Sequence, residues 1–186
     1  MPLPLVLASQ SPRRRELLAT AGIPFTVRAA EVEEIRTPDE PPETYAGRLA
    51  RAKAEAAWRD RDEIVLGADT IVVLGSEVLE KPRDADDARA MLRSLSGCEH
   101  TVITGICLRH PRGTLVDSTA TLVRFAPLAA AEIDEYVASG EPMDKAGAYA
   151  IQGLASKFVE RVEGCYFNVI GLPLSQVYRC LKSLDK

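Results

Sequence analysis

Residues 3–16 read Leu3-Pro-Leu-Val-Leu-Ala-Ser-Gln-Ser-Pro-Arg-Arg-Arg-Glu16, an apolar run followed at once by polar and charged residues. The apolar part, 3–8, has the length and composition of a buried strand. Ser11 is a good N-cap and Pro12 suits the first position of a helix. Gly22 then ends that helix. A strand that leads directly into a helix is typical of α/β proteins.

The rest of the chain continues this alternation. We expect extended segments at 25–29, 64–74, 78–79, 101–108, 115–125 and 158–162, and helices at 42–58, 84–95, 127–139 and 172–184. Gly67-Ala68-Asp69 interrupts the strand 64–74, and Gly75-Ser76 offers a hairpin turn. The order predicts an α/β fold with a mixed central β-sheet flanked by helices, in a single domain over residues 1–186.

Composition narrows the functional classes. The chain has 186 residues, a formal net charge of −4 and a pI near 5.3, with 46% hydrophobic and 27% charged residues. An acidic globular protein is a poor candidate for binding nucleic acid polymers, which favour a basic excess. A small anionic ligand needs only a local basic pocket. We find no apolar run of about 20 residues and no basic leader, so we expect a cytoplasmic protein without membrane association.

The four cysteines, Cys98, Cys107, Cys165 and Cys180, form no CxxC pair. Their spacing fits no zinc template, and we interpret them as ordinary thiols.

Three arginines, Arg13, Arg14 and Arg15, occupy the first turn of the helix that begins at Ser11-Pro12. This end of a helix is already positive, so cations there are unfavourable in isolation. They become favourable if an anion binds at the same end, where free backbone N–H groups, the hydroxyl of Ser9 and guanidinium groups converge on phosphate oxygens. The alternative is a solvated basic turn partly neutralised by Glu16.

Asp69 lies inside an apolar strand sequence. Aspartate is disfavoured in strand interiors, and an unpartnered buried carboxylate would cost several kcal/mol or take up a proton. Asp69 therefore needs a metal ion or a basic side chain beside it. A structural salt bridge or an Asx turn is the alternative interpretation.

Further charged residues complete a set suited to attack on phosphorus: Glu31, Glu33, Glu34, Lys53 and Lys81. Hard carboxylate oxygens hold Mg²⁺ or Mn²⁺, and lysines neutralise developing charge. Taken singly, each of these residues is as easily explained as surface charge.

Residues 144–153, Asp144-Lys-Ala-Gly-Ala-Tyr-Ala-Ile-Gln-Gly153, contain small residues that allow backbone to approach a ligand. Gln152 has an amide that could contact a base edge, although a tight turn is the simpler interpretation. Residues 164–174 are interpreted as a loop that leads into the last helix.

Together these stretches resemble the Maf family of nucleotide pyrophosphatases. The matching segments occur in family order between residues 7 and 174: LASQSPRRRELL, EVEE, GADTIVV, EKPRDADDARAML, LSGCEHTVITG, EPMDKAGAYAIQG and NVIGLPL. The resemblance implies an inosine-triphosphatase-like fold with two lobes around a cleft, usually as a homodimer. It also implies hydrolysis of a nucleoside triphosphate to the monophosphate and pyrophosphate.

The resemblance assigns roles to particular residues. Asp69 would activate water as a general base or metal-bound carboxylate, and Glu33, with Glu34 as its neighbour, would help hold a divalent cation, Mg²⁺ or Mn²⁺. The triphosphate would be held by Ser9, Arg13, Arg14, Lys53 and Lys81.

Arg13, Thr70 and Gln152 resemble the branch that acts on dTTP and UTP. The branch that prefers 7-methyl-GTP typically has an aromatic residue, Gln and Glu at these places. Modified pyrimidine triphosphates are further candidate substrates. A different class of function is a nucleotide-binding regulator of septum formation, a process long associated with the family. A P-loop enzyme is disfavoured because the chain contains no GxxxxGK[ST] motif.

Overall fold

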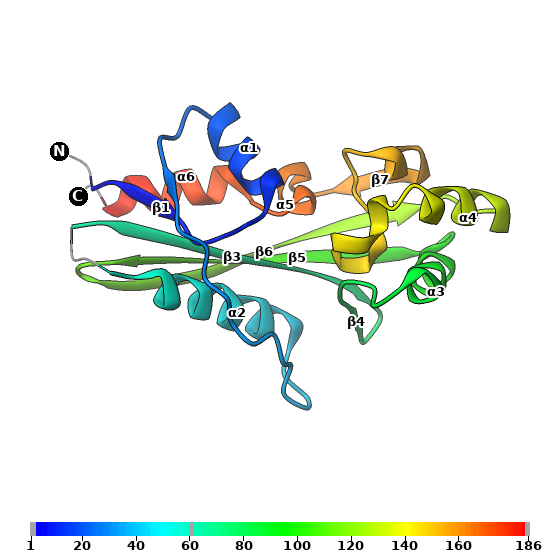
Figure 1. Cartoon of the computed structure of the whole chain (residues 1–186), viewed down its shortest axis with the longest axis horizontal. Coiled ribbons are helices and arrows are strands. Elements are labelled where there is room, and N and C mark those ends of the chain that lie inside the picture. The colour runs from blue at the N-terminus through cyan, green and yellow to red at the C-terminus, as the bar shows by residue number, and fades with distance from the viewer. Residues whose placement is uncertain (1–2, 60–61, 185–186) are drawn as a thin grey trace. The chain divides into compact units, whose positions relative to one another are not determined.

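The computed structural model describes residues 3–59 and 62–184, and its elements follow the predicted order closely (Figure 1). The strands are β1 (Leu5–Leu7), β2 (Thr26–Val27), β3 (Ile64–Leu74), β4 (Glu77–Leu79), β5 (Glu99–His110), β6 (Gly113–Phe125) and β7 (Val159–Glu163). The α-helices are α1 (Pro12–Thr20), α2 (Pro42–Ala57), α3 (Ala85–Leu95), α4 (Ala130–Ala138), α5 (Tyr166–Ile170) and α6 (Leu174–Leu184). Short 3-10 helices lie at η1 (Glu141–Asp144), η2 (Ala146–Ala148) and η3 (Leu154–Phe158).

The described strands form one mixed sheet in the order β2-β1-β3-β5-β6-β7, with β4 also paired with β3. Strand β1 is parallel to β2 and β3, whereas β4 is antiparallel to β3 and β7 is antiparallel to β6. The predicted α/β class, with a mixed sheet flanked by helices, is confirmed.

The chain folds into two compact units, each made of separated segments. The first unit contains Met1–Asp69, Thr104–Thr119 and Gly171–Lys186, and the second contains Thr70–Ile103 and Ala120–Ile170. Strands β3, β5 and β6 therefore each contribute residues to both units. The cleft between two lobes that the family resemblance implies stays a prediction.

In the first unit, α2 lies directly against β3 and β5 because two glycines leave room for its backbone. A Cβ atom added to Gly67 would lie 2.1 Å from the carbonyl oxygen of Ala50, and one added to Gly105 would lie 2.4 Å from that of Ala46. Figure 1 shows α2 on one face of these strands and α1 and α6 on the other. The glycines of β3 and β5 thus set how closely the helix approaches the sheet.

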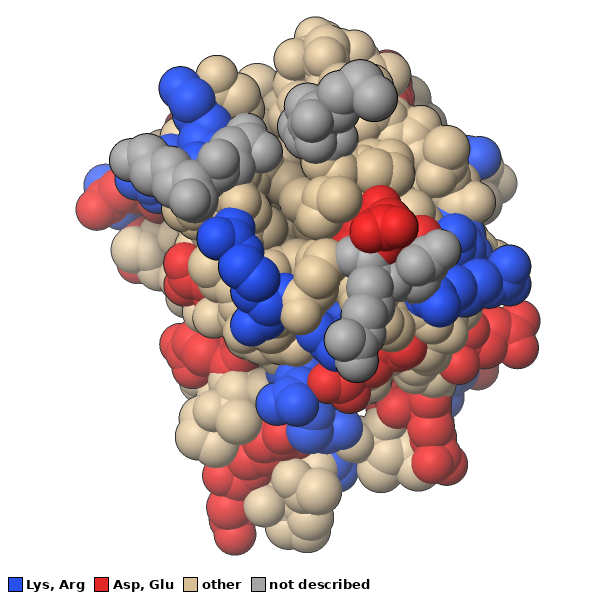
Figure 2. Space-filling view, turned by 90° about the vertical axis from the view of Figure 1, so that its left-hand side faces the viewer, with Lys and Arg blue, Asp and Glu red and all other residues tan. Residues whose placement is uncertain are grey.

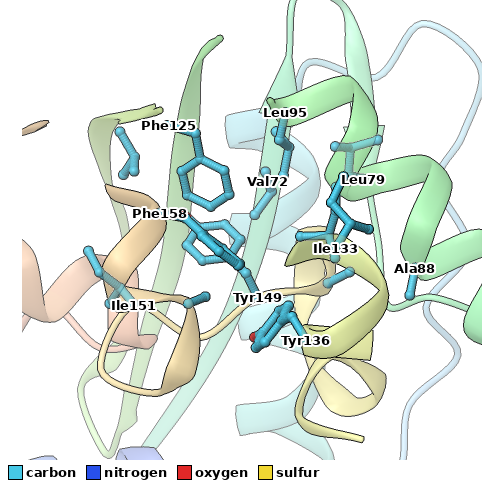
Figure 3. Packing of buried hydrophobic residues seen from close by; sticks show 14 of the residues in the cluster. Val72, Leu79, Ala88, Leu95, Phe125, Ile133, Tyr136, Tyr149, Ile151 and Phe158 are labelled. Atoms are coloured by element: carbon cyan, nitrogen blue, oxygen red, sulfur yellow. The ribbon is translucent and has the colours of Figure 1, made fainter. Parts of the chain in front are cut away.

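The second unit has an aromatic core contributed by strands, helices and the 3-10 segments (Figure 3). The ring of Phe125 packs edge-on against those of Tyr149 and His100, with centroids 4.8 Å and 5.1 Å apart. Tyr136 packs edge-on against Phe158 at 5.5 Å. Edge-to-face aromatic pairs of this kind add stability beyond the area that they bury.

Three local expectations are wrong. Strand β3 runs unbroken through Gly67-Ala68-Asp69, because the glycine reflects the close approach of α2 and not a break. Helix α4 begins only at Ala130, since residues 126–128 are hydrogen-bonded to other segments: Ala126 N–H donates to Phe158 O and Leu128 N–H to Ser96 Oγ. The expected loop at 164–174 contains the short helix α5.

Helix α5 is held by its buried Asn168. The side-chain amide donates to Val102 O and to Thr121 Oγ1, both at 2.9 Å. These bonds join residues far apart in the sequence, so no local pattern predicts them.

The surface carries charges of both signs. On the face drawn in Figure 2, Lys and Arg side chains are mixed with Asp and Glu side chains. Within residues 3–59 and 62–184, none of the helices has both the length and the apolar character needed to cross a bilayer.

Replacing Gly67 with alanine is expected to lower the free energy of unfolding by about 2 kcal/mol or more, because the new methyl group meets backbone atoms that cannot move aside. The matched control is Gly47→Ala within α2. Its Cβ would lie 3.2 Å from the side chain of Val116, which is exposed and can yield, and alanine favours helix by up to about 1 kcal/mol. Urea unfolding of both variants measures the difference, and equal midpoints would contradict it.

His100 is expected to make stability fall with acidity. Its Nε2 lies 2.9 Å from Tyr149 Oη, while Nδ1 has no hydrogen-bond partner among the described residues. Burial lowers the pKa of His100 to about 4, below the ordinary value of 6.5. The unfolded chain therefore binds the proton more tightly, so this contribution is complete above about pH 6.5 and is lost, by about 3 kcal/mol, as pH falls through 4.

The measurement is urea unfolding at pH 7 and pH 4.5 for His100→Gln and for His110→Gln, the only other histidine. His100→Gln should lose less stability between these two pH values than the wild-type protein does. His110 is only half-buried, although burial, Arg112 and Arg109 also lower its pKa, so His110→Gln should stay closer to the wild type than His100→Gln does. The reverse ranking would rule out His100 as the acid-sensitive group.

Candidate functional site

Ser9 and Asp69 are placed together by the register of two parallel strands. Leu7, the last residue of β1, pairs with Leu66 of β3, so Ser9 follows the carboxyl end of β1 while Asp69 lies three residues beyond Leu66 within β3. In α/β sheets this carboxyl end is where ligands usually bind. Side chains alternate along a strand, so Asp69 shares the face of Gly67, the face that α2 covers.

The carboxylate of Asp69 is buried and paired with a lysine from α2. Lys53 Nζ lies 2.5 Å from Asp69 Oδ1 and 2.7 Å from Glu34 Oε1, and the lysine side chain is only 13% exposed. One ammonium group therefore bridges two carboxylates. The cation that Asp69 was predicted to need is present in this structure as Lys53.

Burial raises the pKa of the Asp69 carboxyl above its ordinary value, and the positive charges of Lys53 and Arg14 oppose the rise. A carboxylate whose proton affinity is raised by its surroundings accepts a proton more readily than one in water. Such shifts are common in catalytic groups.

Helix α1 begins as predicted, with Ser11 as N-cap and Pro12 in its first turn. The Arg14 side chain is buried, and it donates from Nε to Gly171 O at 2.8 Å and from Nη1 to Ser9 Oγ at 3.1 Å. Ser9 Oγ also accepts the N–H of Ser11 at 3.2 Å. The arginine thus joins the start of α1 to the segment before α6.

Arg14 does not point into bulk water, and its role in binding an anion stays a prediction. Burial lowers the pKa of Arg14, and the negative charge of Asp69 opposes that effect while the neighbouring Arg13 adds to it. Arg13 is half-buried. The positive end of α1 and the buried acid Asp69 therefore act on each other electrostatically.

The loop that carries the glutamates is anchored by residues that sequence reasoning did not single out. Arg48 donates to both oxygens of the buried Glu40, at 2.7 Å and 2.8 Å, and also to Ile35 O at 2.8 Å. This arginine lowers the pKa of Glu40 to about 2. Tyr45 donates its hydroxyl to Glu34 O at 3.2 Å. These contacts connect α2 with the loop and bring Glu34 to Lys53.

The donor set suits a hard divalent cation only if other ligands join it. The carboxylates of Glu34 and Asp69 both contact the ammonium group of Lys53, so they lie close to each other. Mg²⁺ is commonly held by one or two carboxylates together with substrate phosphates. Over residues 3–59 and 62–184, no group of three or more His, Cys, Asp or Glu side chains could form a cage by itself. The residues fit an ion that binds together with a polyphosphate.

The structure distinguishes between the two adjacent glutamates. Both glutamates are exposed, but it is Glu34 that pairs with Lys53, and Glu33 is the residue predicted to hold the cation. The role of Glu33 stays a prediction.

The remaining predicted residues, Thr70, Lys81 and Gln152, belong to the second unit. Thr70 is half-buried, and Lys81 is exposed in the bend after β4. Gln152 is exposed in a turn closed by the bond from Gly153 N–H to Ala150 O at 3.0 Å. The meeting of these residues with Asp69 stays a prediction.

From the sequence, Lys53 is one of several charged residues that could equally be surface charge, and its neighbours give a reason for its burial. It stands between Ala52 and Ala54 on a helix whose small residues let the backbone approach the sheet. Lys53 lies on the face of the helix that carries the buried Ala50, Ala54 and Ala57, and a buried ammonium group requires a carboxylate partner. The alanines were a signal for this partner.

Comparison with known proteins identifies the family of the chain. The family profile described as Maf-like protein matches residues 4–184. A dTTP/UTP pyrophosphatase of Anaeromyxobacter dehalogenans is 56% identical over 182 residues, covering 96% of this chain and 92% of that protein. Proteins with the same name from Koribacter versatilis and Aquifex aeolicus are 51% and 45% identical, covering 96% and 97% of this chain and 93% and 95% of theirs.

Among solved structures the likeness is distant. A nucleoside-triphosphatase / dITP/XTP pyrophosphatase from Mycobacterium abscessus is 15% identical with a TM-score of 0.43, covering 68% of this chain and 76% of that one. The family match, in contrast, spans almost the whole sequence. The chain belongs to the Maf family.

Proposed function

We propose that this protein hydrolyses dTTP and UTP to the nucleoside monophosphate and pyrophosphate, with the help of a divalent cation. The observation that carries the proposal is the buried Asp69 carboxylate, which is bridged by Lys53 to Glu34 and interacts electrostatically with Arg14. The names of the relatives, which match over nearly their whole length, support the choice of substrate.

Asp69 acts as the proton acceptor in this reaction. Water attacks the α-phosphorus, its proton passes to the Asp69 carboxylate, and the bond from the α-phosphorus to the bridging oxygen breaks to release pyrophosphate. The rate should decline as pH falls through the pKa that Asp69 has in the substrate complex, because the protonated acid cannot accept a proton.

The cationic groups hold the triphosphate. Arg14, Ser9 and the N–H groups at the start of α1 present donors at the positive end of a helix, which attracts phosphate. Lys53, which pairs with Asp69 and Glu34, would turn toward phosphate oxygens when substrate binds. Lys81 adds a further positive charge from the second unit.

A bound Mg²⁺ or Mn²⁺ would neutralise phosphate charge and polarise the scissile bond. Glu34 and Asp69 are the residues of this chain that would hold it, with Glu33 as the neighbouring candidate. Together with the phosphate oxygens they complete an oxygen ligand set of the kind that Mg²⁺ accepts.

Gln152 recognises the nucleobase of the substrate. Arg13 and Thr70 are the other residues that resemble the dTTP/UTP branch. An amide offers one donor group and one acceptor, and thymine and uracil present both on the edge that carries N3 and O4. Modified pyrimidine triphosphates with the same edge are further candidate substrates. The names of the relatives do not favour the 7-methyl-GTP alternative.

Wild-type protein with Mg²⁺ or Mn²⁺ is expected to release pyrophosphate from dTTP and UTP in preference to CTP, ATP and 7-methyl-GTP. Replacement of Asp69 by asparagine should lower kcat by about 1000-fold, because the general base is lost while the shape is kept. Pyrophosphate release across this nucleotide panel measures the rate, and calorimetric titration with a non-hydrolysable dTTP analogue measures binding.

The matched control is Asp117→Asn, which changes an exposed aspartate of β6 and should leave the rate unchanged. Brisk hydrolysis of 7-methyl-GTP without dTTP or UTP turnover would assign the protein to the other branch. Full activity of Asp69→Asn would exclude Asp69 as the base.

The two adjacent glutamates provide a second matched pair. Glu34→Gln is expected to raise the Mn²⁺ concentration needed for half-maximal activity by about tenfold, because it removes one charged oxygen ligand near Asp69. Glu33→Gln should change this concentration less. A larger effect from Glu33→Gln would identify Glu33 as the ligand and leave the Glu34–Lys53 pair as a tether of the loop.

A further inference from the structure

The turn that carries Gln152 is held by side chains with no role in the site described above. Tyr136 of α4 donates its hydroxyl to Glu141 Oε1 at 2.9 Å, and the same hydroxyl oxygen accepts the N–H of Ala150 at 3.2 Å. One end of the turn is therefore bonded to a tyrosine fourteen residues away in the sequence.

Glu141 holds the other end of the turn. Its two carboxylate oxygens accept the N–H of Leu154, at 3.1 Å and 3.2 Å. A Cβ atom on Gly153 would lie 2.4 Å from Glu141 Oε2, so this approach requires glycine. Tyr136 and Glu141 thus bond the chain on both sides of Gln152, and we call this pair the turn clamp.

The turn clamp is fixed by the aromatic core of the second unit. The Tyr136 side chain is buried in the aromatic core, and Ile151, next to Gln152, is buried in the same core (Figure 3). Burial raises the pKa of Tyr136, so the phenol keeps its proton and remains a hydrogen-bond donor to Glu141. Gln152 is exposed between two anchored backbone groups.

Selectivity by an amide requires that its direction be controlled. Uracil and thymine present a donor at N3 and an acceptor at O4, whereas cytosine presents an acceptor and a donor at the corresponding atoms. An amide that rotates freely can satisfy either pattern, since it carries one donor group and one acceptor. A backbone fixed on both sides of Gln152 restricts the positions that its side chain can take.

We propose that Tyr136 and Glu141 are positioning residues that direct Gln152 and thereby set the preference for uracil and thymine over cytosine. This inference rests on the proposed function, in which Gln152 contacts the base. Neither residue touches substrate in this proposal; both act through the turn.

The test replaces Tyr136 with phenylalanine, which removes the hydroxyl that joins Ala150 to Glu141. The ratio of kcat/KM for UTP to that for CTP should fall about tenfold, mainly through a higher KM for UTP, because displacement of a positioning group weakens recognition. A ratio of this kind does not change when part of the protein is merely unfolded. Glu141→Gln keeps the size of the side chain and should lower the ratio in the same direction.

Tyr149→Phe is the matched control, because it removes a hydroxyl from the same core that contacts His100 and not the turn. It should leave the ratio unchanged. In the double variant Tyr136→Phe/Gln152→Ala, the ratio should equal that of Gln152→Ala alone, since both changes act through one group. Amide hydrogen exchange at Ala150 and Leu154 should be faster in Tyr136→Phe than in Tyr149→Phe.

The possible failures are distinct. Wild-type protein that releases no pyrophosphate from UTP or dTTP overturns the proposed function and the role of Gln152 with it. An active wild type with an unchanged ratio in both Tyr136→Phe and Glu141→Gln overturns the turn clamp alone. Additive losses in the double variant would show that Tyr136 acts by some route other than Gln152.

Discussion

The close approach of α2 to strands β3 and β5 is the constraint on which the first unit depends. Glycines 67 and 105 remove the side chains that would hold the helix backbone away from the sheet. Because the helix lies so close, Lys53 reaches the carboxylate of Asp69 two residues beyond Gly67 on the same face of the strand. The packing constraint and the charge pair at the site thus have one origin.

Charge balance explains why an acid can lie within this buried strand. Lys53 bridges Asp69 and Glu34. The positive charge of Arg14, at the start of α1, also favours the ionised form of Asp69. Burial still raises the proton affinity of Asp69, so the site combines a poised acceptor with nearby cations. Arg48, Glu40 and Tyr45 hold the acidic loop in place.

The second unit also holds a polar side chain, Gln152, on a fixed part of the backbone. Its aromatic core fixes Tyr136, and Glu141 links that tyrosine to the turn of Gln152. A side chain on a loop becomes selective only when its backbone is held, and here the bonds come from an adjoining helix and a 3-10 segment. Catalytic and selective residues thus depend on packing beneath them.

The sequence alone determined the order of strands and helices, the Ser11-Pro12 start of α1 and the need of Asp69 for a cation, because periodicity, capping and burial are local properties. The family motifs in the sequence also supplied the candidate residues. Tertiary structure alone decided that β3 continues through Asp69, that Glu34 meets Lys53, and that Arg48 and Tyr136 anchor distant segments. Such contacts join residues remote in sequence, and their partners are chosen by packing, which no local pattern records.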